Sequence, residues 1–231
     1  MLPELVLREE QEGNTPLLIL LGFTSVVAGF TVSNWLIEGP SSLLVVSFSA
    51  VPLIYPLTGF FFDDEKNVAP HIPELKIYFS LFLGQVLGFF TLSYLKPDSF
   101  QMQASTAGLT GNFMDVGLFR SVLTHNVGVF FAILAVSFLI GSAGVFILSW
   151  NASVLGVFLA GLAQRDPALP IAYIPHASLE MLGFISAGIL GSLASATVYR
   201  EHFDLEHWIN LTKLLALGLG MVILAALLES A

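Results

Sequence analysis

The sequence predicts an all-α polytopic transmembrane helix bundle of about seven spans. Of its 231 residues, 55% are apolar and only 11% are charged, whereas a soluble domain carries about 25% charged residues. The apolar residues gather in stretches of about 20, the length that a helix needs to cross the hydrocarbon core. No polar stretch is long enough to fold alone. We therefore expect a multi-pass protein of the cell membrane whose main partner is the lipid bilayer.

The charge balance excludes two other classes of protein. The chain holds only eight Lys and Arg residues and has a formal net charge of −9, so it lacks the basic surface that a nucleic-acid-binding protein needs. It contains no Cys, which excludes a disulfide-stabilised scaffold. We expect an acidic membrane protein that does not bind nucleic acid.

We expect a single transmembrane domain over residues 1–231. Its spans cover residues 17–36, 43–62, 77–95, 122–140, 144–163, 178–199 and 208–228. The first span follows Thr15-Pro16, a cap followed by proline in the first turn. The second contains Pro52 and Pro56, which membrane helices tolerate when neighbours satisfy the freed carbonyls.

The third span carries the pattern Gly84-x-x-x-Gly88. Small residues at this spacing let two membrane helices approach closely. We favour packing within the bundle over a homodimer or other homo-oligomer seam. The polar connection that follows, residues 96–121, is the longest in the chain, and we expect part of it to lie in the membrane interface.

A stretch of 44 residues, from Ser121 to Gln164, contains no Asp, Glu, Lys or Arg. One straight helix of this length would measure about 66 Å, more than twice the roughly 30 Å core. The chain must therefore reverse, and Gly141-Ser142-Ala143-Gly144 is the place that favours a turn. The sequence thus predicts a tight helical hairpin over residues 122–163.

Residues 168–177 are apolar but contain two prolines. We interpret this segment as re-entrant or interfacial, followed by a span over residues 178–199. If residues 168–199 are divided differently, the bundle has six spans. Trp208 opens the last span, and Lys213, one turn inside it, can extend its ammonium group to the interface.

Glu180 is an ionisable residue inside a predicted span, which makes it a candidate for function. His176 lies four residues earlier, so both side chains share one helix face. We predict contact between them, directly or through one water. The pair has three interpretations: a structural link, part of an ion or proton pathway, or part of a metal site completed by His125.

Two further polar groups stand out. His125-Asn126, near the start of the predicted hairpin, can cap that helix and is the group we expect to meet the pair on the sixth span. Asn151, inside the fifth span, calls for an interhelical partner or lines a polar pore. The sequence contains no nucleophile elbow, phosphate-binding loop or zincin motif, so we expect no catalytic residues, no cofactor and no bound metal.

The order of these residues resembles the stage II sporulation protein M-like family of integral membrane proteins. That family shows an Asn-Asn pair, a Gly-interrupted hairpin, an Asn-Gly pair and a Pro-His-Gly-x-x-Glu motif. The counterparts here are His125-Asn126, Gly141 to Gly144, Asn151-Ala152 and Pro175-His176-Ala177-Ser178-Leu179-Glu180. His125 replaces the first Asn, and Ala replaces Gly in two of the pairs, so the chain resembles a divergent member.

The resemblance implies a polytopic scaffold. In sporulating bacteria the family member holds peptidoglycan-degrading proteins at the engulfing membrane. We therefore expect a membrane scaffold or assembly partner without catalysis, which binds a membrane or cell-envelope protein. The alternative is a channel or permease for an ion, proton or small solute that uses Glu180, His176 and Asn151. A metal-dependent intramembrane hydrolase, with His176, Glu180 and His125 as ligands, is a third alternative.

Overall fold

The computed structural model describes residues 14–37, 41–64, 72–110, 116–200 and 205–229, and within these ranges it contains helices and no strand. The α-helices are α2 (Thr15–Leu36), α3 (Ser42–Asp64), α4 (Ile72–Leu95), α5 (Gln101–Thr110), α6 (Val116–Ile140), α7 (Val145–Arg165), α8 (Leu169–Tyr199) and α9 (Leu205–Glu229). Two short 3-10 helices, η2 (Pro97–Phe100) and η3 (Gly141–Gly144), join neighbouring helices. The predicted all-α class is confirmed.

Six segments of the described chain are long and apolar enough to cross a membrane: 15–36, 42–59, 74–95, 120–165, 169–199 and 205–229. The segment 120–165 contains 46 residues and is divided by η3 into α6 and α7. The six segments therefore correspond to seven long helices. All but the N-terminal part of α8 match a predicted span closely.

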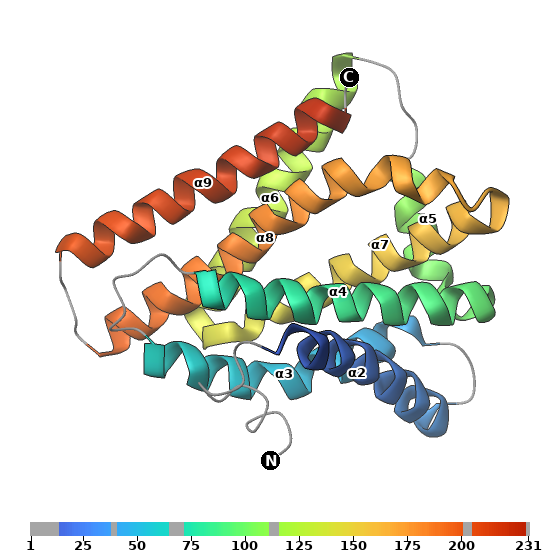
Figure 1. Cartoon of the computed structure of the whole chain (residues 1–231), viewed down its shortest axis with the longest axis horizontal. Coiled ribbons are helices and arrows are strands. Elements are labelled where there is room, and N and C mark those ends of the chain that lie inside the picture. The colour runs from blue at the N-terminus through green and yellow to red at the C-terminus, as the bar shows by residue number, and fades with distance from the viewer. Residues whose placement is uncertain (1–13, 38–40, 65–71, 111–115, 201–204, 230–231) are drawn as a thin grey trace.

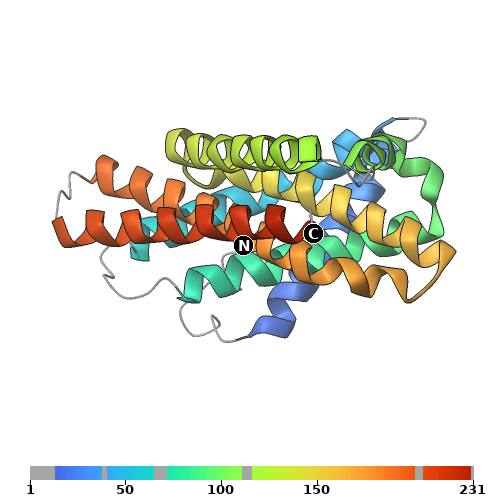
Figure 2. The ribbon, with the colours of Figure 1, turned by 90° about the horizontal axis from the view of Figure 1, so that it is seen from above.

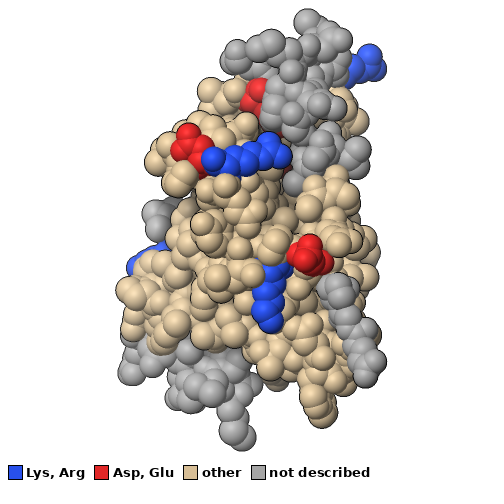
Figure 3. Space-filling view, turned by 90° about the vertical axis from the view of Figure 1, so that its right-hand side faces the viewer, with Lys and Arg blue, Asp and Glu red and all other residues tan. Residues whose placement is uncertain are grey.

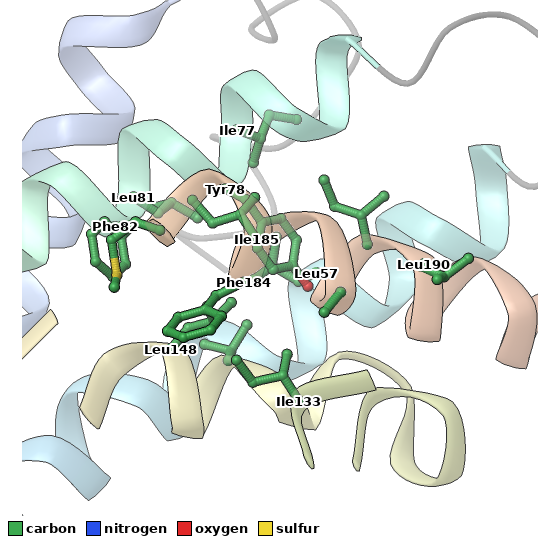
Figure 4. Close-up of a cluster of buried hydrophobic side chains, with 14 of the residues drawn as sticks. Leu57, Ile77, Tyr78, Leu81, Phe82, Ile133, Leu148, Phe184, Ile185 and Leu190 are labelled. Atoms are coloured by element: carbon green, nitrogen blue, oxygen red, sulfur yellow. The ribbon is translucent and has the colours of Figure 1, made fainter. Parts of the chain in front are cut away.

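The long helices form two groups (Figure 1). In the first group α2 packs on α3 and α4, and α4 packs on α7. In the second group α8 packs on both α6 and α9. The groups meet where α8 touches α3, α4 and α7. Figure 4 shows the side chains at this junction, among them Tyr78, Leu148 and Ile185, and all three are buried.

The predicted turn at Gly141 to Gly144 is present as η3, but its two arms do not pack along each other. Figures 1 and 2 show α6 and α7 diverging from η3. Helix α6 packs on α8 in the second group, whereas α7 packs on α4 in the first. The uncharged segment therefore makes a tight turn, as expected, and its arms connect the two groups of helices.

Two features fix the turn. Gly141 has a φ of +62°, a left-handed conformation that costs a residue with a Cβ atom about 1–2 kcal/mol. The next backbone N–H, that of Ser142, donates to Oγ1 of Thr58 on α3 at 3.1 Å. The first N–H groups of a helix lack partners within it, so Thr58 acts as a cap supplied by another helix.

Residues 168–177 were predicted to be re-entrant or interfacial, and the re-entrant alternative is wrong because residues 169–177 are helical and continuous with the span that follows. Helix α8 runs without interruption for 31 residues, about 46 Å, and it is bent (Figure 1). Pro170 lies in the first turn, where a missing N–H costs nothing. Pro175 lies inside the helix, and such a residue removes one hydrogen bond and bends the helix without ending it.

A short helical element also fills part of the polar connection after α4. Residues 97–110 form η2 and α5, within the connection of which part was predicted to lie in the membrane interface. Phe100 is fully buried and packs against Phe30 and Phe89, with ring centroids 6.1 Å and 6.0 Å away. This aromatic anchor holds α5 against the end of the first group of helices.

Helices α2 and α4 cross with their backbones in contact. A Cβ atom added to Gly22 would meet the carbonyl of Leu81, and one added to Gly84 would meet the carbonyl of Ile19. A Cβ atom at Gly88 would lie 2.9 Å from Cβ of Val26. The Gly84-x-x-x-Gly88 pattern therefore serves packing within one chain, which confirms the favoured interpretation.

Gly84→Ala should destabilise the bundle by about 1–3 kcal/mol, because the added methyl group meets backbone atoms that cannot move aside. The matched control is Gly220→Ala, where nothing lies within 4 Å of the new Cβ atom. That control should be neutral or stabilising by up to about 1 kcal/mol. Thermal unfolding in detergent measures both variants; equal melting temperatures would contradict the close contact.

Gly141→Ala should cost about 1–2 kcal/mol because alanine resists the left-handed conformation, and its methyl group would also lie 2.8 Å from Cγ2 of Thr58. Gly59→Ala, at an open position on α3, is the control and should slightly stabilise that helix. Unfolding in a denaturing detergent measures the stability of both variants. A Gly141→Ala variant as stable as Gly59→Ala would exclude a strained turn.

Candidate functional site

Of the contact predicted between His176 and Glu180, directly or through one water, the direct form is not made. In the described part of the chain neither a hydrogen bond nor an ion pair joins them. The imidazole turns back along α8 to Tyr173, with ring centroids 5.6 Å apart. Tyr173 in turn lies edge-on to Phe158 of α7, at 5.1 Å. His176 therefore belongs to an aromatic contact between α7 and α8, and Glu180 has a different neighbour.

That neighbour is another carboxylate. Glu180 on α8 is close enough to Glu229, the last residue of α9, for their charges to interact. Both side chains are partly exposed. The sequence did not reveal this pair, because the two residues are far apart along the chain and α9 was predicted to end just before Glu229. Helices α8 and α9 run antiparallel, with Gly183 facing Gly218 and Val222, so Glu180 and Glu229 lie toward the same end of this helix pair.

The other predicted site residues are dispersed. His125 is exposed on α6, whereas Asn126 beside it is buried. Neither caps the helix, because α6 already begins at Val116. Asn151 on α7 donates from Nδ2 to the carbonyl of Ile147 in its own helix at 2.8 Å, so the expected interhelical hydrogen bond is not made. No group of three metal-ligating side chains occurs among the residues described.

A buried polar cluster that the sequence did not single out lies around η3. We call it the turn cluster; it consists of Thr58 on α3, Tyr78 on α4, Ser142 in η3 and Ser192 on α8. The Tyr78 hydroxyl faces the hydroxyls of Ser142 and Ser192, and these two oxygens lie 3.4 Å apart. Ser192 donates to the carbonyl of Gly188 at 2.8 Å. Four elements of both helix groups thus meet through neutral hydrogen-bonding groups.

A second polar contact lies further along α4. Ser149 on α7 donates to Oε1 of Gln85 at 2.9 Å, and both residues are buried. A small cavity adjoins Gln85 and Tyr78, with about 20 Å³ accessible to the centre of a water molecule, which is room for one water. It is otherwise lined by apolar side chains of α3, α4 and α7. His176, Glu180 and Asn151 do not line it.

The chemistry available at the turn cluster is limited to neutral hydrogen bonding. Hydroxyl and amide groups of this kind hold helices together in a membrane, and they supply neither a charged nucleophile nor a proton acceptor of ordinary strength. Tyr78, Gln85 and Ser192 could have been noticed as polar residues inside predicted spans. Nothing in the sequence indicated that these side chains lie close together. They do so only because α6 and α7 leave η3 in different directions and pack on different helices.

Comparison with known proteins identifies one family. The family model described as Stage II sporulation protein M matches residues 77–231, from the first turns of α4 to the end of the chain. Helices α2 and α3 lie outside the match. No curated protein and no solved structure matches the chain.

Ser149→Ala should destabilise the protein by about 1–3 kcal/mol, since it leaves the Gln85 carbonyl oxygen buried without a donor. Replacing both partners, as Ser149→Ala with Gln85→Leu, should recover most of the loss, because no polar atom then lacks a partner. A double-mutant cycle on unfolding free energies tests this. Additive effects of the two substitutions would show that the hydrogen bond contributes nothing.

Proposed function

The chain belongs to the stage II sporulation protein M family, and from this premise we propose that it is an integral membrane scaffold or assembly partner that has no catalysis of its own. Family membership and the six apolar segments point to a membrane protein. The scaffold role is our extension of that likeness. In this role the protein would hold a membrane or cell-envelope protein at a defined place in the bilayer.

The observation that carries the proposal is how the buried polar side chains are used. Six hydroxyl groups in the bundle each donate a hydrogen bond to a backbone carbonyl of their own helix: those of Ser49, Ser80, Ser153, Ser186, Ser192 and Thr197. Ser149 is bonded to Gln85 on a neighbouring helix. Hydroxyl groups used in this way are already satisfied within the protein and offer little to a substrate, which favours a structural role.

The rival function, a channel or permease, needs a continuous polar path. No contact among its three proposed residues is recorded in the described part of the chain: His176 contacts Tyr173, and Asn151 donates to a carbonyl of its own helix. The cavity beside Gln85 has room for about one water molecule. These features support the scaffold over conduction through the bundle.

The proposal predicts that the full-length protein, affinity-purified from its native membranes in several mild detergents, carries a second membrane or envelope protein in a fixed ratio near one to one. The measurement is quantitative mass spectrometry of the purified complex. Recovery of the chain alone, or only of its own oligomer, in every detergent would contradict the scaffold role.

The same preparation tests the rival function. Purified protein in liposomes loaded with a pH-sensitive dye should leave proton and potassium flux at the level of empty liposomes. Flux above that level that disappears in Glu180→Gln would favour the permease. Thr212→Val, at an exposed position on α9, is the matched control for reconstitution.

A further inference from the structure

The buried amide of Gln85 uses only one of its two polar atoms. Gln85 lies on α4 and is 3% exposed. Its Oε1 accepts from the hydroxyl of Ser149 on α7 at 2.9 Å, but its Nε2 has no hydrogen-bond partner in the described part of the chain. That nitrogen carries two N–H donors, and a buried donor without an acceptor loses the free energy of hydration that it has in water. The amide therefore calls for an acceptor from outside the described residues.

A small cavity borders this amide. It lies between α3, α4 and α7, and the only polar side chains that line it are those of Tyr78 and Gln85. Five of its lining side chains are labelled in Figure 4: Leu57, Tyr78, Leu81, Phe82 and Leu148. The cavity offers about 20 Å³ to the centre of a water molecule, and one water needs about 10–15 Å³ by this measure. Its size therefore fits one water and excludes a larger organic ligand.

The free group determines the chemistry of the occupant. Because Nε2 can only donate, the occupant must be a hydrogen-bond acceptor, and a metal cation does not fit. An anion could accept, but the cavity is otherwise lined by apolar side chains and by Tyr78, and an unpaired charge in such a place is very costly. A small neutral acceptor remains, and water is the one that the volume admits.

A water in this cavity finds enough partners at Gln85 to be held there. It can accept from Nε2, and it can donate to Oε1, which has two lone pairs and uses one of them for Ser149. Buried waters typically make two to four hydrogen bonds, whereas cavities that stay dry are lined by apolar groups alone. The hydroxyl of Tyr78 is not needed, because it faces Ser142 and Ser192 in the turn cluster.

We propose that the cavity between α3, α4 and α7 is a binding site for one structural water, which is held by the amide of Gln85. The water completes the hydrogen bonding of a side chain that links α4 to α7 within the first group of helices. This inference does not depend on the scaffold function, since it concerns only residues inside the bundle.

A cavity-filling substitution distinguishes a hydrated cavity from a dry one. Val145 is buried and lines the cavity from α7, so Val145→Ile adds one methylene group to its wall. In a hydrated cavity this group expels the water and leaves Nε2 without an acceptor, and we expect the melting temperature in detergent to fall by at least about 2 °C. In a dry cavity the added group gains contacts and raises the melting temperature. Val32→Ile, at an exposed position on α2, is the matched control and should leave it unchanged.

The same substitution in a Gln85→Met background separates loss of the water from overpacking. Methionine has a similar length and no N–H group, so the cavity then has no amide to hold a water. Val145→Ile should therefore leave the melting temperature of this background unchanged or raise it. An equal fall in both backgrounds would show that the added methylene group is simply too large.

Nuclear magnetic resonance detects the water directly. In full-length protein labelled with 15N-glutamine, we expect a cross peak between water and the side-chain amide protons of Gln85, which Gln85→Met identifies by its absence. The Ser149 hydroxyl exchanges its proton with water and lies beside the amide, so it could relay such a signal. The cross peak should therefore persist in Ser149→Ala and disappear in Val145→Ile.

Four results would overturn the proposal. They are a missing cross peak in the unaltered protein, a cross peak that disappears in Ser149→Ala, a melting temperature that Val145→Ile raises, and an equal fall in both backgrounds. If a variant does not accumulate, the cross peak of the unaltered protein still decides whether the cavity is hydrated.

Discussion

The arrangement of the whole bundle depends on one reversal of the chain at η3. A segment of 44 residues without Asp, Glu, Lys or Arg cannot remain in a membrane as a single helix, so it must turn where backbone polar groups still find partners. Gly141 provides the left-handed conformation and Thr58 accepts from the backbone N–H of Ser142. Because the acceptor comes from α3, the turn forms only against the first group of helices, and it fixes where both arms leave.

From that turn the two arms join different groups of helices, and close backbone contacts then determine how each group packs. Gly22 and Gly84 bring α2 against α4, Gly183 brings α8 against α9, and Gly191 brings α8 against the carbonyl of Leu134 on α6. Since lipid is as apolar as the side chains, such contacts rather than hydrophobic burial hold membrane helices together. The family match begins inside α4, so α2 supplies its half of the α2–α4 contact from outside the matched region.

The sequence predicted the helices well and their partners poorly, for a physical reason. Apolar length and the missing charges define a span locally, and glycine at Gly141 marks a turn locally. Whether the arms of that turn pack on each other is decided by contacts with residues far along the chain. The same limit explains the site: His176 and Glu180 share a helix face, but the imidazole of His176 packs against Tyr173. Helix α8 likewise continues through Pro175 because of its packing against other helices, which cannot be predicted from the residues around Pro175 alone.

The division of polar groups between the interior and the boundary follows from the cost of burial. A hydroxyl can donate to a carbonyl of its own helix, as Ser192 and Thr197 do, so it enters the core at small cost. A carboxylate has no such intrahelical solution and needs donors or a cation. Charged side chains are accordingly few and scattered on the end of the molecule that Figure 3 shows. Between the two helix groups only neutral groups meet in the turn cluster, the hydroxyls of Tyr78, Ser142 and Ser192, whereas Glu180 and Glu229 are partly exposed.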